Sequence, residues 1–363
     1  MKASFIFFAS AVLASPILEK RSATSSATSS YPTGTLPDPI TFALENNTKW
    51  HISNVGSIYS STDPSMGWDN GRTSVLDNTL FWNFGDVLSL DGLQDGFSTG
   101  PAFYGTPDDM LRVDMKNITD VLDLIFAEPD SADPVPQQPT PFWGLSTSNV
   151  AEVSPGLGIG FVWEVWRDTT GTRIDRGLGI YRATLGDEMP IANRTGPLVT
   201  GPDAIEVGIM TVMNAEGYIY TYTNGGPTGI IVGRALVADA FDIDAYEFLR
   251  LDNQWIKGVP NKLEASLEYG VQGIVHSDGQ GSIMWSNYFQ KYMLFTSSFG
   301  ATMMFSTSDT PYGPWTGLYE LENIPGYGVN VHPFWSPDGS HKTLYLSSGM
   351  NNIIHMYKLD FHF

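Results

Sequence analysis

The chain has 363 residues and contains no cysteine, which excludes disulfides, thiol nucleophiles and cysteine-ligated metals. Its 39 acidic residues outnumber its 19 Lys and Arg residues, so the formal net charge is -20. Nucleic acids and anionic membrane surfaces bind clustered Lys and Arg. We therefore expect no nucleic acid and no membrane as partners, and the length suits one large domain with its own core.

The first residues have the pattern of a secretory signal. Lys2 precedes an apolar stretch at 5–13, and residues 12–14 offer a cleavage site. We predict a signal peptide at residues 1–14 and a secreted, extracellular protein. The pair Lys20-Arg21 is typical of dibasic processing in fungal secretion, although such pairs also occur by chance. Three N-glycosylation sequons indicate a glycoprotein; they begin at Asn46, Asn117 and Asn193.

Residues 15–39 are predicted to be a pro-segment and flexible leader, because 22–39 is rich in Ser, Thr and Pro. No comparable linker follows, so residues 40–363 are predicted to form one catalytic domain. Short apolar and aromatic runs separated by Gly, Asn, Asp and Pro are typical of strands and turns. Helical periodicity is limited to 121–126 and 238–249.

A strand that opens with a polar residue is followed by a turn and a strongly apolar strand five times along this domain. The units begin at Asp69, Ser146, Glu206, Ser282 and Asn330, and a third strand follows in most of them. Repeated antiparallel units of this kind predict an all-β, five-bladed β-propeller. Their irregular spacing leaves a six-bladed propeller and a β-sandwich as alternatives.

The first strand of each propeller blade lines the central channel, so polar residues that open these strands are expected to converge. Glu206 is expected to donate a proton or tune another carboxyl, or else to be a solvated strand end. His332 is expected to bind a sugar hydroxyl or to satisfy a hydrogen bond in the core. The predicted substrate-binding ring at the channel comprises Asn149, Glu206, Ser282 and His332, next to Asp69.

The best-marked site lies in the first unit. A two-residue turn at Asp77-Asn78 predicts a hairpin, because both residues tolerate positive φ. Counting outward from this turn places Asp69 opposite Asp86 at the open end. Residues directly opposite in an antiparallel pair have Cβ atoms roughly 4.5–5.5 Å apart. The hairpin therefore predicts two neighbouring carboxylates, and one extra residue in the turn would break this register.

Two close carboxylates raise the pKa of one of them, which yields one proton donor and one ionised partner. Glycoside hydrolysis requires this division, and the short separation favours a retaining reaction. Alternatively, each aspartate caps a turn, or the pair binds a metal, which would need further oxygen ligands. The chain has no cofactor motif and no metal motif.

Arg72 is expected to hold the aspartate pair or a substrate hydroxyl. Sugar rings stack on exposed aromatic side chains, but most aromatics of an all-β protein lie in the core. The candidates for stacking are Trp82 and Trp143, with Trp68 and Trp285 as further candidates.

These residues resemble a known family. The stretches 69–74 and 81–86 resemble the paired signature of the propeller family called domain of unknown function 4185. Further similarity at 217–220, 233–236, 245–248, 285–288, 291–295 and 311–315 extends the resemblance over roughly residues 50 to 360. Part of that family is glycoside hydrolase family 183, which contains endo-D-arabinanases.

The resemblance implies that Asp69 and Asp86 are the catalytic pair, because they match the two motif aspartates of that family. Three departures are visible. Asn70 replaces the usual Gly, Val87 replaces the usual Thr, and 280–282 lacks the acidic residue that some members carry. The first two departures leave the aspartate pair intact. The third departure concerns the substrate that the resemblance implies.

The sequence therefore favours a secreted, monomeric glycoside hydrolase that cleaves a neutral polysaccharide or oligosaccharide, with arabinan-like furanosides implied by the resemblance. The first alternative is a polysaccharide lyase, which neutralises a uronate with basic residues; the acidic composition weighs against it. The second is a non-catalytic carbohydrate-binding propeller.

Overall fold

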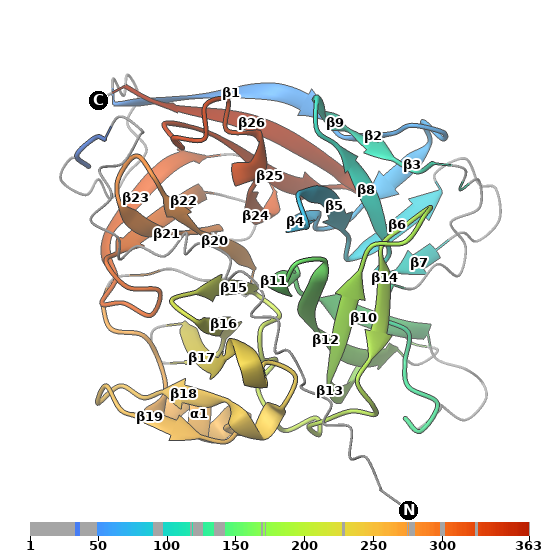
Figure 1. Cartoon of the computed structure of the whole chain (residues 1–363), viewed down its shortest axis with the longest axis vertical. Coiled ribbons are helices and arrows are strands. Elements are labelled where there is room, and N and C mark those ends of the chain that lie inside the picture. The colour runs from blue at the N-terminus through green and yellow to red at the C-terminus, as the bar shows by residue number, and fades with distance from the viewer. Residues whose placement is uncertain are drawn as a thin grey trace, which may run out of the picture.

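The structure is a computed structural model that describes residues 33–36, 49–89, 97–116, 118, 126–133, 142–167, 170, 172–226, 229–273, 275, 280–297, 302–323 and 326–362. Five sheets of four or five strands surround a central axis (Figure 1). We call them blades 1 to 5 in chain order. A sixth, three-stranded sheet lies beside blade 1 and contains β3 (Met66–Trp68), β6 (Asp86–Ser89) and β7 (Phe97–Thr99).

Blades 2, 3 and 4 are built from consecutive strands, whereas the strands of the sixth sheet interrupt blade 1 and the N-terminal strand joins blade 5. Blade 1 contains β4 (Arg72–Leu76), β5 (Thr79–Asn83), β8 (Ala102–Thr106), β9 (Asp109–Asp114) and β2 (Tyr59–Ser60). Blade 2 contains β10 (Phe142–Thr147), β11 (Ala151–Ser154), β12 (Leu157–Arg167), β13 (Arg173–Thr184) and β14 (Ile191–Arg194). Blade 3 contains β15 (Thr211–Ala215), β16 (Tyr218–Asn224), β17 (Ile230–Leu236), β18 (Glu247–Leu249) and β19 (Trp255–Lys257).

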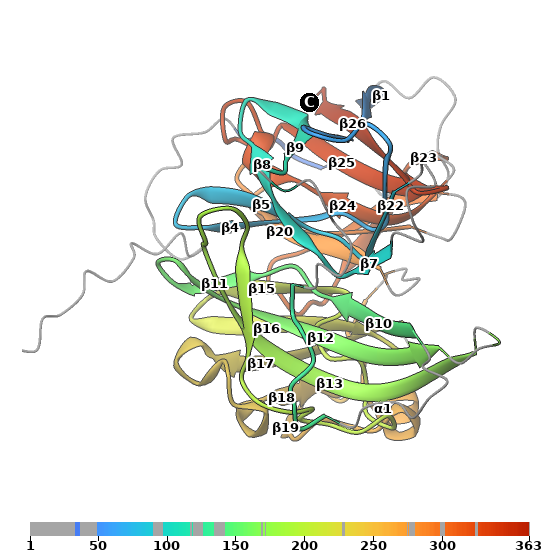
Figure 2. The ribbon, with the colours of Figure 1, turned by 90° about the vertical axis from the view of Figure 1, so that its right-hand side faces the viewer.

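Blade 4 contains β20 (Gly281–Ser286), β21 (Lys291–Ser297), β22 (Thr302–Ser308) and β23 (Thr316–Asn323). Blade 5 contains β24 (Tyr327–Val331), β25 (Thr343–Met350) and β26 (Ile353–Phe361), and its outer strand is β1 (Trp50–Ser57). β1 pairs with β26 from Trp50 opposite Phe361 to Ser57 opposite His355. The two strands run side by side in Figure 1 and Figure 2, so the N-terminal strand closes the last blade.

Apolar residues fill the space between neighbouring blades. Successive side chains of a strand point to opposite faces, so each blade contributes to two clusters. In blade 4, for example, Met293 and Phe295 pack toward blade 5, whereas Tyr292 and Leu294 pack toward blade 3. Five such clusters join blades 1–2, 2–3, 3–4, 4–5 and 5–1. This ring confirms the all-β propeller prediction, with as many large sheets as five blades require.

The hairpin prediction for blade 1 is correct. Asp77 and Asn78 have φ values of 43° and 61°, which allows the tight turn. The β4–β5 register runs from Leu76 opposite Thr79 to Arg72 opposite Asn83. The expected bounds of four first strands were wrong: β4 begins at Arg72 and not at Asp69, β10 and β11 are separate strands flanking Asn149, β15 begins at Thr211 and not at Glu206, and β24 ends at Val331.

Local elements account for the helical signals. The pattern at 238–249 corresponds to the two 3-10 turns η1 (Val237–Asp239) and η2 (Ile243–Ala245). Residues 121–125 lie outside the described residues. One α-helix, α1 (Lys262–Glu268), was not predicted. No helix among the described residues is long and apolar enough to cross a membrane.

The predicted signal peptide and most of the leader also lie outside the described residues. Within the leader, residues 33–36 contact the propeller. The Gly34 N–H donates to the Tyr288 carbonyl at 3.0 Å, and Leu36 packs against the cluster between blades 4 and 5.

Candidate active site

Asp69 and Asp86 lie where the β4–β5 hairpin meets the three-stranded sheet. The Asp69 N–H donates to the Asp86 carbonyl at 2.8 Å, and the Gly85 N–H donates to the Asp69 carbonyl at 2.8 Å. The regular ladder is interrupted at residues 70–71 and 84–85, but no residue is inserted, because the register of Arg72 opposite Asn83 continues to Trp68 opposite Val87. Pairing resumes at Trp68 opposite Val87 in β3 and β6. The two aspartates therefore meet at the backbone in the predicted register, although they lie between the β4–β5 and β3–β6 ladders and not inside one continuous ladder.

The Asp69 carboxylate is half-buried, with one oxygen hydrogen-bonded and the other beside a glycine. The Tyr327 hydroxyl, from the start of β24, donates to Oδ1. Oδ2 lies against Gly85, where an added Cβ atom would sit 2.9 Å away. Burial raises the pKa of Asp69, and the positive charge of Arg72 opposes that rise. Asp86 is also half-buried.

Arg72 connects three blades at the axis. Its side chain is buried, and its guanidinium donates to the carbonyls of Thr147 in blade 2 at 2.9 Å and Ile209 in blade 3 at 3.2 Å. Burial lowers the pKa of Arg72 to about 10, so the group is charged at neutral pH. Because Arg72 is only 4% exposed, it is placed to act on Asp69 and the blades, not on a substrate hydroxyl.

Asn70 occupies the bend between the two aspartate-bearing segments, with a φ of 47°. Its buried amide satisfies both of its ends when the oxygen faces the Arg72 guanidinium, at 3.1 and 2.9 Å, and the nitrogen faces Oε1 of Gln280 at 3.2 Å. Asn330 of β24 lies next to the same amide. Residues from blades 1, 4 and 5 thus form a polar cluster beneath Asp69.

The predicted channel residues mostly join neighbouring blades. The Asn149 amide accepts from the Val212 N–H at 2.8 Å and donates to the Val212 carbonyl at 2.9 Å, which links blades 2 and 3. The Ser282 hydroxyl accepts from the Val331 N–H at 2.6 Å, which links blades 4 and 5. The structure therefore gives both side chains a bonding role inside the propeller.

His332 takes the core role that was one of its two alternatives. It is fully buried, with its ring nitrogens 2.8 Å from the hydroxyls of Thr73 and Ser347. Burial lowers the pKa of His332 to about 3, so the ring is neutral. With no exposed surface, it cannot contact a sugar without rearrangement of blades 5 and 1.

The prediction that tryptophans stack on a sugar ring is wrong for those that are buried. Trp82 is 0% exposed and packs on Phe84, His332 and Trp335, so no face is open to a sugar ring. Trp68 is likewise buried. The side chain of Trp143 lies outside the described residues. Trp285 is half-buried and packs edge-on to Tyr292.

Glu206 precedes β15 and is partly exposed. Its carboxylate forms a 2.7 Å ion pair with Arg173, the first residue of β13. Burial raises the pKa of Glu206, and Arg173 opposes that rise. The Glu206 carbonyl accepts from the Ile209 N–H at 3.1 Å, which places Glu206 one turn from the carbonyl that holds Arg72.

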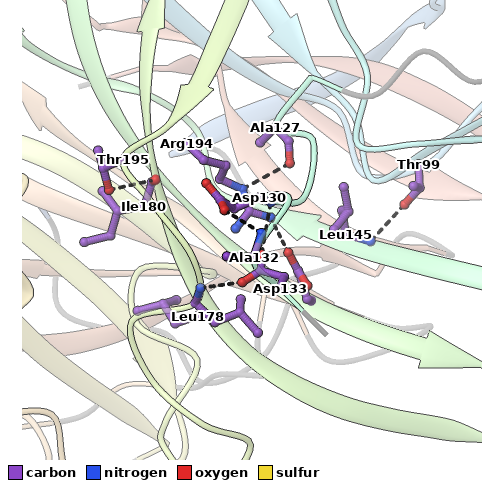
Figure 3. A network of polar contacts seen from close by, with 12 residues as sticks. Thr99, Ala127, Asp130, Ala132, Asp133, Leu145, Leu178, Ile180, Arg194 and Thr195 are labelled. Carbon is purple, nitrogen blue, oxygen red and sulfur yellow. Dashed lines mark hydrogen bonds and ion pairs between the residues drawn. The ribbon is translucent and has the colours of Figure 1, made fainter. Parts of the chain in front are cut away.

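A second group of polar contacts joins residues 126–133 to blade 2, with Asp133 and Arg194 among its members (Figure 3). Arg194 of β14 forms a 2.6 Å ion pair with Glu164 of β12 and donates to the Ala127 carbonyl at 3.2 Å. The Asp133 carboxylate accepts from the N–H groups of Asp130 and Leu198. Burial raises the pKa of Glu164 to about 7, with Arg194 opposing and the hydrogen-bonded Asp133 adding to the rise. This group fastens residues 126–133 to blade 2.

Sequence reasoning did not assign Tyr327, Gln280 or Asn330 to the candidate site. Tyr327 opens β24, Gln280 precedes β20, and Asn330, which was expected to open the fifth unit, lies inside β24. A polar residue near the start of a first strand was the available signal. Within the described part of the chain, no group of three or more His, Asp or Glu side chains is placed to hold a metal ion.

No protein-family model and no curated protein matches the chain. Solved structures that overlay on it include glycoside hydrolases. One is the GH43_1 enzyme from Xanthomonas citri complexed with xylotriose, at TM-score 0.47 and 12% identity over 85% of this chain and 90% of that chain. Another is exo-beta-1,3-galactanase from Phanerochaete chrysosporium, at TM-score 0.43 and 10% identity over 85% and 64%. A third is sucrose-6-phosphate hydrolase from Lactobacillus gasseri, at TM-score 0.44 and 11% identity over 84% and 61%.

These overlaps are too weak to carry an argument about activity. The fold is instead established by the blades and the clusters between them. The resemblance to the domain of unknown function 4185 family stays a prediction, because no family model matches.

Proposed function

We propose that the protein is a secreted glycoside hydrolase that cleaves a neutral glycan with Asp69 and Asp86 as its catalytic pair. The observation that carries this proposal is the backbone pairing of the two aspartates, with the Asp69 carboxylate bonded by Tyr327 and beside the charge of Arg72.

The chemistry requires one carboxyl that donates a proton to the leaving oxygen and one carboxylate that acts as nucleophile or activates water. The backbone pairing brings the two carboxyl-bearing residues, Asp69 and Asp86, to the same end of the hairpin. Glu206 is a third candidate carboxyl, since burial raises its pKa. A short separation of the pair would give retention of the anomeric configuration.

The substrate class follows from charge and resemblance. A formal net charge of -20 disfavours polyanionic glycans, and the motif resemblance points to arabinan-like furanosides. Secretion, glycosylation and a monomeric state belong to the same proposal. Of the three sequons, Asn193 lies exposed on β14.

A polysaccharide lyase would need a basic residue that faces the substrate uronate. At the candidate site the described cation is Arg72, which is 4% exposed and bonded to two carbonyls. This observation favours the hydrolase over the lyase.

The test is a screen of the secreted protein against neutral plant, fungal and mycobacterial glycans, with release of reducing ends as the readout. We expect saturated products from a neutral glycan. Unsaturated products from uronate polymers alone would overturn the hydrolase proposal. Glycan binding without turnover would identify a carbohydrate-binding module.

A further inference from the structure

Tyr327 reaches from blade 5 to the candidate site of blade 1. Its hydroxyl donates to Oδ1 of Asp69, although 258 positions separate the two residues in the chain. The contact therefore exists only once blade 5 has docked against blade 1. Tyr327 is partly buried, as is Asp69.

The backbone around Tyr327 leaves it little freedom. Gly326 and Gly328 flank it with φ values of 148° and 66°, which L side chains rarely adopt. An added Cβ atom at Gly326 would lie 2.2 Å from Oγ of Ser348, and one at Gly328 would lie 2.5 Å from Oε1 of Gln280. The register Tyr327 opposite Gly349 fixes the same segment to β25. The position of the phenol is thus set by close packing on both sides.

The two oxygens of Asp69 have different surroundings. Oδ1 accepts the phenol hydrogen bond, whereas Oδ2 faces Gly85, which has no side chain. A hydrogen bond to one oxygen fixes the plane of the carboxylate and leaves the lone pairs of the other free. Oδ2 is therefore the oxygen that can meet a reacting atom.

The charges around Asp69 act in opposite directions. A phenol donor and the Arg72 cation both stabilise the ionised carboxylate, while burial destabilises it. Asp86 lies on the paired strand, where its backbone carbonyl accepts from the Asp69 N–H. Removing the phenol donor would therefore raise the pKa of Asp69 further, because only Arg72 would then oppose the effect of burial.

We infer that Tyr327 is a positioning residue, which holds Oδ1 of Asp69 and so presents Oδ2 for reaction. The catalytic part of this inference rests on the proposed glycoside hydrolysis, whereas the contact itself does not. Tyr327 does not touch the substrate in this account; it acts through Asp69.

The test is Tyr327→Phe, which keeps the ring and removes the hydroxyl. We expect kcat to fall roughly 10-fold to 100-fold, as for loss of a charge-assisted hydrogen bond in an active site, with KM little changed. The acid limb of the pH–rate profile should move to higher pH, because the carboxylate loses a donor. An unchanged profile would overturn the inference.

The matched control is Tyr59→Phe. Tyr59 also donates to an aspartate, Oδ2 of Asp109 at 2.8 Å, but it is exposed and belongs to β2. This variant should keep kcat and the pH–rate profile of the unmodified protein. A shift of the same size in both variants would show that loss of any tyrosine hydroxyl perturbs the protein, and would overturn the inference.

A second readout separates the contact from the proposed reaction. Carbon NMR of aspartate carboxyls can follow the titration of Asp69, assigned with Asp69→Asn, in the unmodified protein and in Tyr327→Phe. A higher apparent pKa in Tyr327→Phe supports the positioning contact even if no glycan is cleaved, in which case the proposed function fails alone. An unchanged pKa would overturn the positioning role even in an active hydrolase.

Discussion

Asn70 shows how a single backbone position links the sequence motif to the site. Its φ of 47° is a conformation that Gly and Asn adopt at low cost. This explains why the resembling family uses Gly there and why Asn is compatible. In this chain the side chain has an added role, because its amide contacts the Arg72 guanidinium.

Gly85 gives a prediction about the position of the Asp69 carboxylate. An alanine Cβ there would lie 2.9 Å from Oδ2 of Asp69, so the carboxylate must move. We expect Gly85→Ala to lower kcat at least 10-fold while the melting temperature changes by a few degrees. Gly201→Ala is the control, since nothing lies within 4 Å of its added Cβ, and it should leave kcat unchanged. Full activity of Gly85→Ala would show that the position of Oδ2 is unimportant.

Arg72 gives a prediction about stability. Lysine keeps the charge but lacks the planar fork that reaches Thr147 and Ile209 together. Buried carbonyls without donors are costly, so we expect Arg72→Lys to lower the free energy of unfolding by about 2–4 kcal/mol. Denaturant unfolding measures this, and Arg112→Lys on the exposed face of β9 should change it by less than about 0.5 kcal/mol. Equal stability of the two variants would show that Arg72 does not join the three blades.

Among the secondary structure elements, the strands and their register were the most predictable from the sequence. Each blade has strands in the segments where its first two strands were expected, although only β20 begins next to its predicted polar residue, and the β4–β5 register follows from its Asp-Asn turn. The strands were predictable because both faces of every blade are buried, so that successive side chains of a strand are apolar. The third strand of blade 1, β8, was not predicted.

The site was less predictable because it depends on contacts between blades. Asp69 and Asp86 were found because they are close in sequence. Tyr327 comes from a distant strand, and no local pattern marks its partner. Trp82 was misassigned because an aromatic side chain packs against the next blade as readily as against a sugar, and only the packed blades decide between them.

The buried carboxyls of blade 2 give a prediction about pH. The pKa of Glu164 is raised to about 7 from its ordinary 4.5. In the unfolded chain the group ionises near 4.5, so the folded state is relatively most stable at low pH. Stability should fall as the pH rises from 4.5 through 7, by up to about 3 kcal/mol at 1.36 kcal/mol per unit of pKa shift.

Urea unfolding at pH 4.5 and pH 8 measures this slope. Glu164→Gln should remove most of it, because the glutamine mimics the neutral acid at both pH values. Glu268→Gln, at a half-exposed ion pair with Arg250, should retain the slope. A slope that persists in Glu164→Gln would assign it to another group.

The whole molecule is a ring whose closure depends on β1. Trp50 begins this strand, is 3% exposed, and packs edge-on to Phe305 and Tyr319 of blade 4. Trp50→Ala should lower the free energy of unfolding by about 3–5 kcal/mol. Leu263→Ala on α1 is the control, because Leu263 is 72% exposed and should change stability by less than about 0.5 kcal/mol. A mild effect of Trp50→Ala would show that the ring does not need its N-terminal strand.

We propose that Asp69 and Asp86 together hydrolyse a glycan. The most direct measurement is the kcat of Asp69→Asn and Asp86→Asn on the best substrate from the glycan screen, with glycan affinity measured in parallel. Both variants should lose at least about 1,000-fold in kcat while still binding the glycan, and the exposed Asp252→Asn should be fully active. Near-normal turnover by either active-site variant would contradict the account.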